Sequence, residues 1–495
     1  GADDGRGRMS VELALLGVLV APVVQALLVL ALPKPPGLRD VIHIGGALFT
    51  ALCAACLVNA AAHGIGTRLV LARPLPNVDL AFVIEPFGAL MGALIAGLSV
   101  LHAVHAAGIV RATHEKAPAR LMAFMALATG ATMAVAYSAN LFTFFVAYQA
   151  LTLTAFPLVA HRGDEDARVA GRTFLATLLA ASMGLFLPAM IWTYALTGAL
   201  DFRPGGVLGE ETDALTANVL LVLFVMGLAM AAIPPLHRWL PVAKNAPTPA
   251  LVSLQALLVL PAGGIGLIKI AAFVFGPALL TAQIASRGLI VLVGAGMCVA
   301  ALIALSKQDV RERLAYSCMA QSLAVAMGTL LALPAGLFAA ALQVVAGACG
   351  VATLLMAVGT TSAITMRTNV ADYAGLGRVM PWTFAGFAVG AASMIGMPPF
   401  AGAWAKLWLI AAASGAGLIW AAALAGVAAV LTFVHLGPLA ASALAGRPPT
   451  DAFKRPDGAS ILLVAPVILS AAATLWLLVL ADPLASFLSP IWTPR

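Results

Sequence analysis

This sequence has few charged residues. Only 9% of its 495 residues are Asp, Glu, Lys or Arg, whereas 62% are hydrophobic, and the mean hydropathy is +1.02. A soluble domain of this length cannot bury so much apolar surface, and apolar runs of 18 or more residues recur along the chain. These features exclude an ordinary soluble protein. They predict a multi-pass helical protein in the lipid bilayer, expected in the bacterial inner (cell) membrane.

The sequence also lacks the signatures of nucleotide and cofactor sites. No Gly-rich phosphate loop appears, and the segments between the apolar runs are too short for a nucleotide-binding domain. The five cysteines are scattered within apolar runs and form no iron–sulfur, haem or metal pattern. We therefore expect no catalytic site, cofactor, metal or nucleic-acid partner in this chain. Membership of an NADH- or ferredoxin-type oxidoreductase or of an antiporter complex stays open.

About fourteen stretches are long enough to cross a membrane as helices. The first, from about Val11 to Leu32, is too long for a signal-peptide core and is interpreted as a retained helix. Gly1 is also consistent with a processed or engineered terminus. The predicted limits are 11–32, 42–65, 80–110, 121–138, 140–161, 173–198, 216–240, 249–275, 288–306, 314–332, 335–359, 381–412, 416–441 and 459–482.

Lys and Arg are distributed unevenly over the segments between these spans. If both termini lie outside, most cations fall on the inner side, as the positive-inside rule expects. The net charge of +7 then reflects topology and gives no indication of nucleic acid. The inner cations are Lys34, Arg39, Arg111, Lys116, Arg120, Arg162, Arg168, Arg172, Arg238, Lys244, Lys307, Arg311, Arg313, Arg367, Arg378, Arg447, Lys454 and Arg455. The outer cations are Arg6, Arg8, Arg68, Arg73, Arg203, Arg287 and Arg495.

The most unusual stretch runs from Pro234 to Lys269. It joins two apolar segments, yet it carries His237, Arg238, Lys244 and several closely spaced prolines. Because proline removes a backbone donor, a helix that enters this stretch must break. A broken helix at membrane depth is buried in protein or lines a cavity. The same pattern is also compatible with an ordinary inner loop punctuated by proline.

Two lysines fall inside apolar segments, where charge is costly and usually faces a cavity or a partner. Lys406 follows Pro398, Pro399 and Gly402, which indicates a second broken helix, and we favour a functional role for it. Lys269 lies near the end of the eighth span, where a side chain that snorkels to the outer interface is the preferred interpretation.

Other ionisable residues near or within the spans have two interpretations each. Glu85 lies near the start of an apolar run and is expected at the interface, with pairing to a neighbour as the alternative. His102 and His105 lie one turn apart on the third span and suit either a proton relay or helix packing. His435 in the thirteenth span has the same two interpretations.

The proline-rich stretch also carries a family resemblance. PPLHRWLPVAKNAPTPALVS, from Pro234, resembles the P-x-H-x-W-L-P-x-A…A-P-T-P-V-S signature of the antiporter-like subunits of respiratory complex I, Mrp cation/proton antiporters and membrane-bound hydrogenases, the proton-conducting membrane transporter family. The resemblance covers roughly residues 80 to 440. Further matches in the expected order are Asn140-Leu141 with Phe144-Phe145, Asp309-Val310-Arg311 with Leu314-Ala315-Tyr316-Ser317, Gly375-Leu376-Gly377-Arg378 with Met380-Pro381, and Gly396-Met397-Pro398-Pro399-Phe400 through Lys406.

The resemblance implies a fold of two inverted five-helix repeats, each with one broken helix, in spans seven and twelve. It divides the chain into N-terminal helices 1–3 (1–110), a first repeat of helices 4–8 (121–275), a second repeat of helices 9–13 (288–441) and a C-terminal helix 14 (442–495). The expected fold class is an all-α polytopic membrane protein with about 14 transmembrane helices.

The departures from the family pattern fall on its proton path. The family pairs a glutamate in the fifth helix with a lysine in the seventh, and this chain has Gln149 and Met230 there. The eighth-helix histidine or lysine matches Gln255 or the region of Leu260 and Pro261, whereas Lys406 matches the twelfth-helix lysine. The eleventh-helix H-x-x-x-H-x-x-x-K pattern reads Gln343, Gly347 and Val351.

Glutamine and methionine cannot take up and release protons, so the family's charge switch is absent. No Asp or Glu occurs within residues 137–160 or 214–307, which argues against replacement by a neighbouring acid. The ion-pathway candidates are Lys406, His237, Lys269, Gln149, Gln255 and Met230.

The principal hypothesis is an antiporter-like membrane subunit of a multi-subunit ion-translocating complex. Its partners would be other membrane subunits, including antiporter-like paralogues, and the lost residues argue against proton conduction by this chain. The alternative is an active proton or cation/bicarbonate-linked transporter subunit that uses Lys406. In that alternative the chain pairs with a soluble partner on the cytoplasmic face for inorganic-carbon uptake.

Overall fold

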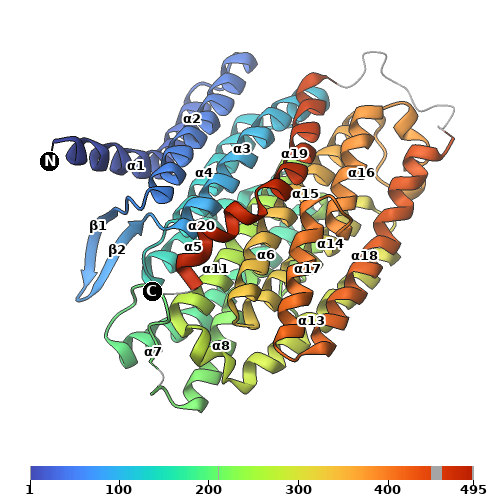
Figure 1. The fold of residues 1–495 in the computed structure, drawn as a ribbon. Coiled ribbons are helices and arrows are strands. Elements are labelled where there is room, and N and C mark those ends of the chain that lie inside the picture. Colours follow the sequence, from blue (N-terminus) through green and yellow to red (C-terminus); the bar gives the residue numbers. More distant parts are fainter. Residues whose placement is uncertain (1, 210, 448–459, 493–495) are drawn as a thin grey trace.

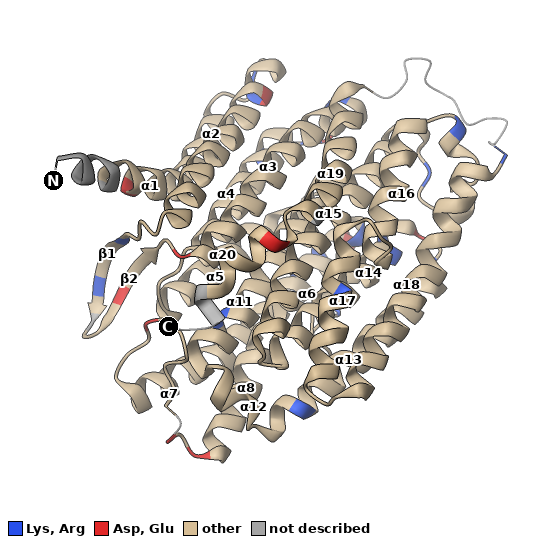
Figure 2. Ribbon diagram, viewed as in Figure 1, with Lys and Arg blue, Asp and Glu red and all other residues tan. Residues whose placement is uncertain are grey.

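Long helices packed side by side make up nearly all of the protein. The computed structural model describes residues 2–209, 211–447 and 460–492 (Figure 1). Within them, ten helices are long and apolar enough to cross a membrane, or eleven if one bent pair counts as a single span. Figure 2 shows that charged residues colour little of these helices. The prediction of a polytopic helical membrane protein is confirmed.

The chain passes through three groups of elements. The first group is α1 (Ala2–Ala31), α2 (Pro36–Ala62), β1 (Arg68–Leu75), β2 (Val78–Val83) and α3 (Pro86–Thr113). The second is α4 (Pro118–Ala136), α5 (Leu141–Val159), α6 (Glu165–Ala181), η1 (Ser182–Phe186), α7 (Leu187–Thr197), α8 (Ala214–Gly227), η2 (Ala229–Ala231), α9 (Trp239–Val242), η3 (Ala243–Asn245), α10 (Thr248–Val252), η4 (Ser253–Gly263), α11 (Gly264–Lys269), η5 (Ile270–Phe275) and α12 (Pro277–Thr281). The third is α13 (Ile284–Ser306), α14 (Val310–Leu330), α15 (Pro334–Thr365), η6 (Val370–Tyr373), η7 (Leu376–Arg378), α16 (Pro381–Ile395), α17 (Ala401–Gly415), α18 (Ile419–Ala445), α19 (Ile461–Val479) and α20 (Ala481–Trp492).

Helix starts follow from local chemistry. Proline stands in the first turn of α2, α3, α4, α15 and α16, where its missing N–H has no helical partner to lose. Asn140 caps α5 by accepting from Thr143 N at 2.8 Å, and Asp164 caps α6 by accepting from Ala167 N at 2.8 Å. These signals fix where the chain turns. Predicted and observed starts agree to within about three residues for α4, α5, α15 and α16, whereas α2, α3 and α6 begin about six to eight residues from the predicted starts.

A β-hairpin interrupts the expected all-α order. β1 and β2 pair antiparallel, with Arg68 opposite Val83, across a two-residue turn at Pro76 and Asn77. The third span was predicted to begin at residue 80, but its helix begins at Pro86. The strand residues are apolar enough to be taken for the start of a span, and their pairing with each other decides the structure.

The two ends of the helix bundle carry different elements and side chains. The basic face carries Arg39, Arg111, Lys116, Arg162, Lys244 and Lys307 at the helix ends. The hairpin face carries β1, β2 and the start of α3 and α5; β2 bridges to Ser138 just before α5. The long helices run between these faces (Figure 1).

Two predicted spans are not single helices. Span 216–240 contains one long helix, α8, and residues 228–247 contain only the short elements η2, α9 and η3. Span 381–412 consists of α16 and α17, separated by residues 396–400. Span 314–332 corresponds to α14, which is long enough but more polar than the ten candidates. Span 459–482 corresponds to α19, and α20 follows it after a bend of 69°.

The centre of the bundle is formed by two spans that other helices surround. Thr248–Phe275 is buried throughout, Pro334–Thr365 is buried except near its two ends, and the two spans pack against each other. The first contains the wide π-helical turns η4 and η5, and Pro261 lies within η4. Polar side chains on these two spans therefore face other protein side chains, and they define where a site at membrane depth can lie.

Candidate functional site

The first interruption is the stretch of residues 228–247 between α8 and α10. Backbone groups there lack helical partners, and side chains bind them. Tyr148 on α5 accepts at its Oη from the Met230 N–H at 2.8 Å, and Ser322 on α14 donates to the Ala231 carbonyl at 2.7 Å. A Cβ at Gly263 would lie 2.8 Å from the Ala231 Cα, so only glycine permits this approach. Met230 itself is fully buried and offers an apolar side chain. These two contacts thus hold the Met230–Ala231 backbone without an acidic or a basic side chain.

Glutamines occupy the buried polar positions around this interruption. Gln149 on α5 accepts at Oε1 from the Ser182 hydroxyl at 3.1 Å. Gln255 in η4 is 1% exposed. Within the described residues, the buried atoms Gln149 Nε2 and Gln255 Oε1 have no hydrogen-bond partner. Because amides donate and accept without titrating, they can hold water but cannot store a proton.

The second interruption is the stretch of residues 396–400 between α16 and α17, and Lys406 lies in the first turns of α17. Helix α16 ends at Ile395, so the Met394 carbonyl is free of a helical partner. Lys406 Nζ donates to this carbonyl, and Gln321 Nε2 donates to it at 3.3 Å. Gln343 Nε2 in turn donates to Gln321 Oε1 at 2.7 Å. A neutral chain of amides therefore leads from the centre of α15 to a partly buried lysine.

Gly396 is required for this arrangement. Its φ of 93° lies in the left-handed region, and a Cβ there would lie 2.7 Å from the Lys406 Cδ. Among the residues that the structure describes, no carboxylate lies within ion-pair distance of Lys406. The neighbouring Ser393 hydroxyl is buried without a partner. Lys406 is therefore a cation with neutral acceptors.

Sequence reasoning named His435 but missed the buried cluster that Ser317 and Arg313 form with it beside α18. His435 Nδ1 lies 2.9 Å from the Leu431 carbonyl, so it carries the proton and leaves Nε2 to face Ser317 Oγ at 2.6 Å. Arg313 was placed among the inner-loop cations, but it is 6% exposed and donates to the His435 and Lys307 carbonyls. The adjacent Leu314–Ser317 motif is the only sequence signal for this cluster.

Lys269 does not snorkel, and that expectation is wrong. Its side chain is fully buried and forms an ion pair with Glu85 at 3.2 Å. Nζ also donates to the Ser138 carbonyl at 2.8 Å and lies 5.1 Å from the centre of the Phe202 ring. The bridge between β2 and Ser138 covers this end of the span. Glu85 accordingly takes the paired alternative, with 20% of its side chain exposed.

The remaining candidates lie elsewhere. His237 is partly buried in the first interruption near the basic face, with Nδ1 buried and unpartnered among the described residues. His102 Nε2 lies 2.9 Å from the Pro249 carbonyl and His105 Nε2 lies 3.0 Å from Thr360 Oγ1. Gln149 thus lies on α5 and Met230 within the first interruption. Gln255 lies on a central span, and Lys406 lies just after the second interruption. The structure places Lys269 and His237 towards opposite faces.

The chain is similar in sequence to known membrane proteins. The family model described as NADH:quinone oxidoreductase/Mrp antiporter, TM, matches residues 138–432. The NADH-quinone oxidoreductase subunit N of Desulforudis audaxviator (strain MP104C) is 28% identical over 366 residues, which cover 73% of this chain and 72% of that protein. Chain 5 of the NAD(P)H-quinone oxidoreductase of Synechocystis sp. is 27% identical over 370 residues, covering 70% of this chain but only 52% of that one. The chain thus spans about half the length of such relatives.

Two solved structures share the fold. A chain of the membrane-bound sulfane sulfur reductase (MBS), an archaeal respiratory membrane complex, superposes with a TM-score of 0.83 at 22% identity and 97% coverage of both chains. A chain of the Mrp complex from Dietzia sp. DQ12-45-1b superposes with a TM-score of 0.81 at 24% identity, covering 100% of this chain and 98% of that one. The family match excludes α1–α3 and hence Glu85, whereas it includes Lys269 and Lys406.

Proposed function

Because this chain belongs to the NADH:quinone oxidoreductase/Mrp antiporter transmembrane family, we propose that it is an antiporter-like subunit of a multi-subunit ion-translocating membrane complex. Its partners are other membrane subunits, including antiporter-like paralogues. Two solved structures of similar fold come from assemblies described as complexes, which supports this proposal.

One observation carries the second half of the proposal: among the described residues, the buried hydrogen bonds to the backbone of Ala229–Ala231 come from Tyr148, Trp239 and Ser322, and none involves an acid, a lysine, an arginine or a histidine. Tyr148, Ser182 and Ser322 bind backbone or amide groups there, and Gln149 and Met230 stand where the family has its glutamate and lysine. Without a group that changes charge near neutral pH, a water-filled seam has no electrostatic switch. This chain therefore serves the complex without the family's Glu–Lys step, and other subunits carry that step.

The finer architecture belongs to the same proposal. We take α8 with residues 228–247 as span seven, α14 as span ten and α16 with α17 as span twelve, which brings the total to fourteen. Helices 4–8 (121–275) and 9–13 (288–441) then form the two inverted repeats, flanked by 1–110 and 442–495. The basic face lies inside the cell and both termini lie outside, as the distribution of Lys and Arg favours.

Purification of the intact complex through this chain tests the proposal. After extraction in a mild detergent, mass spectrometry should find several other membrane subunits, at least one of them antiporter-like. Purification of the chain alone, or with one soluble protein, would overturn the multi-subunit assignment and support the alternative of an uptake system with a cytoplasmic partner.

Lys406 supports a second candidate, active proton or cation transport through this chain. The observation in its favour is a cation at a helix break, bound only to a carbonyl that Gln321 shares. The chain should be reconstituted in liposomes that contain a pH-sensitive dye, as wild type and as Lys406→Met. Proton flux that the substitution abolishes would establish this candidate; equal flux in both would remove its main residue.

A further inference from the structure

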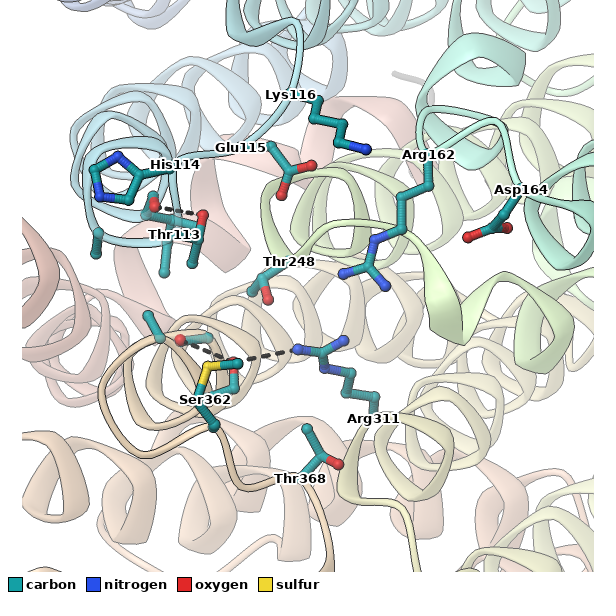
Figure 3. Close-up of a pocket in the computed structure, with 15 residues that line it drawn as sticks. Thr113, His114, Glu115, Lys116, Arg162, Asp164, Thr248, Arg311, Ser362 and Thr368 are labelled. Atoms are coloured by element: carbon teal, nitrogen blue, oxygen red, sulfur yellow. Dashed lines mark hydrogen bonds between the residues drawn. The ribbon is translucent and has the colours of Figure 1, made fainter. Parts of the chain in front are cut away.

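A cavity of about 600 Å³ opens on the basic face, remote from Lys406. Its walls come from the end of α3 with residues 114–116, the segment after α5 with Arg162 and Asp164, the start of α10, the start of α14 and the end of α15 (Figure 3). Segments from the N-terminal helices and from both predicted repeats therefore meet in one cavity, which is large enough for a small-molecule ligand.

Two arginines face this cavity without a carboxylate partner. Arg311 donates from Nη2 to the Ser362 hydroxyl at 3.2 Å, but its Nε is buried and has no partner in the described part of the chain. Arg162 is exposed to the cavity and makes no ion pair with any described residue. Figure 3 shows the two guanidinium groups directed towards each other. Like charges in this position repel unless an anion lies between them.

The other lining groups fit the same ligand. Lys116 and the hydroxyls of Thr248 and Thr368 line the cavity and have no side-chain hydrogen bond with described residues. The Asp164 carboxylate is occupied, because it caps α6 through Ala167 N. Glu115 is the second carboxylate, so three cations (Arg162, Arg311 and Lys116) stand against two acids. The cavity thus offers an excess of one positive charge.

We propose that this cavity binds an oxyanion of the phosphate class between Arg162 and Arg311. Planar guanidinium groups bind such oxygens in pairs, and the buried Arg311 Nε gains the acceptor that it lacks. Thr248 and Thr368 supply hydroxyl donors from α10 and from the segment after α15. The bound anion joins the segment after α5 to the second predicted repeat at the basic face. The phosphate group comes either from a free phosphate or from the headgroup of an anionic phospholipid.

The first experiment measures binding of radiolabelled inorganic phosphate to the purified complex in nanodiscs made of a zwitterionic lipid. Wild type should bind phosphate, and Arg162→Gln should weaken binding by about tenfold or more, since a charge-assisted pair is lost. Arg162→Lys should retain part of the binding. Arg162 is exposed, so these variants should keep the wild-type thermal unfolding midpoint without phosphate.

Arg172→Gln is the matched control. Arg172 also lies near the basic face, but it pairs with Glu165 at 3.1 Å and does not line the cavity. Its substitution should leave phosphate binding unchanged. A loss in Arg172→Gln equal to that in Arg162→Gln would show that general surface charge binds the anion, and it would overturn the proposed site.

The second arm tests the lipid source. Nanodiscs that contain phosphatidylglycerol are analysed by native mass spectrometry for lipid retained on the complex. Retention by wild type and Arg172→Gln, but not by Arg162→Gln, assigns the site to a lipid headgroup. Competition by inorganic phosphate assigns both ligands to the same cavity. If neither phosphate nor phosphatidylglycerol distinguishes wild type from Arg162→Gln, the proposal is wrong.

Discussion

Two lysines in apolar spans have opposite surroundings. Lys269, near the hairpin face, is fully buried against Glu85, the Ser138 carbonyl and the Phe202 ring. Lys406, at the second interruption, donates to the Met394 carbonyl and has no ion-pair partner in the described ranges. The first charge is neutralised by a fixed partner, whereas the second is not. A buried lysine with a carboxylate is part of the scaffold, and one without a carboxylate depends on water or on a neighbouring subunit.

The largest expected effect comes from Glu85→Gln, which leaves Lys269 charged and unpaired inside the protein. Breaking a buried ion pair from one side costs about 3–5 kcal/mol, and the partial exposure of Glu85 favours the lower end. Unfolding of the purified protein in detergent should report this loss. The double variant Glu85→Gln/Lys269→Met should recover much of it; additive losses would show that the two charges are not coupled.

Gly396→Ala should have the next largest effect, because it strains the backbone that positions Lys406. A non-glycine residue at a φ of 93° costs about 1–3 kcal/mol, and the new Cβ would also meet the lysine side chain. The same unfolding measurement applies. Gly417→Ala is the control, since Gly417 also has a positive φ of 74° but has open space around it. A larger loss at Gly396 measures the contact with Lys406.

The sequence indicated one of the two lysine sites better than the other. Lys406 follows a proline- and glycine-rich break, and such local punctuation is readable from neighbouring residues. The Glu85–Lys269 pair joins positions that are far apart in the chain, and it forms where the end of α11 meets the residue before α3. Periodicity and hydropathy report local polarity, but they do not report which helices meet. The buried position of Arg313 was missed for the same reason.

The β-hairpin was missed because its strands are apolar, and apolar composition was taken as evidence for the start of a membrane-spanning helix. Val78–Val83 is apolar enough to extend the following span towards its start, and the two-residue turn before it is the only local signal. Near Pro234 and at residues 396–400, where prolines and glycines cluster in the sequence, the structure has no long continuous helix. Motifs succeed where a fixed residue type is needed for backbone geometry.

A lysine–carboxylate cluster at the basic face resembles the Lys269–Glu85 pair but is more exposed. Its contribution to stability should be smaller and should depend on pH. Glu312 lies 2.5 Å from Lys244 Nζ and 2.8 Å from Lys307 Nζ. Partial burial alone would raise the pKa of Glu312, but hydrogen bonds from both lysines outweigh it and lower the pKa. A lowered folded-state pKa stabilises the protein above the unfolded value, and this contribution is lost as the pH falls through the folded pKa.

Glu312→Gln should therefore cost about 1 kcal/mol at neutral pH, a value reduced by the solvent that reaches both lysines. In acid, below the lowered pKa, wild type and variant should unfold at the same temperature. The thermal midpoint of both proteins across this pH range provides the measurement. A difference that persists in acid would show that Glu312 acts through packing and not through its charge.

Lys406→Met should have the smallest effect on stability and provides the sharpest contrast with Lys269. Methionine keeps much of the side-chain volume beside Gly396, and its removal of charge leaves no carboxylate unpaired in the described structure. Replacing an uncompensated cation by an apolar group is neutral or stabilising, so the change should stay below about 1 kcal/mol. A loss as large as that of Glu85→Gln would reveal an acidic partner of Lys406. If the loss appears only in the intact complex, another subunit supplies that partner. If the protein instead tolerates Lys406→Met while ion flux through the complex falls, the lysine contributes to transport and not to folding.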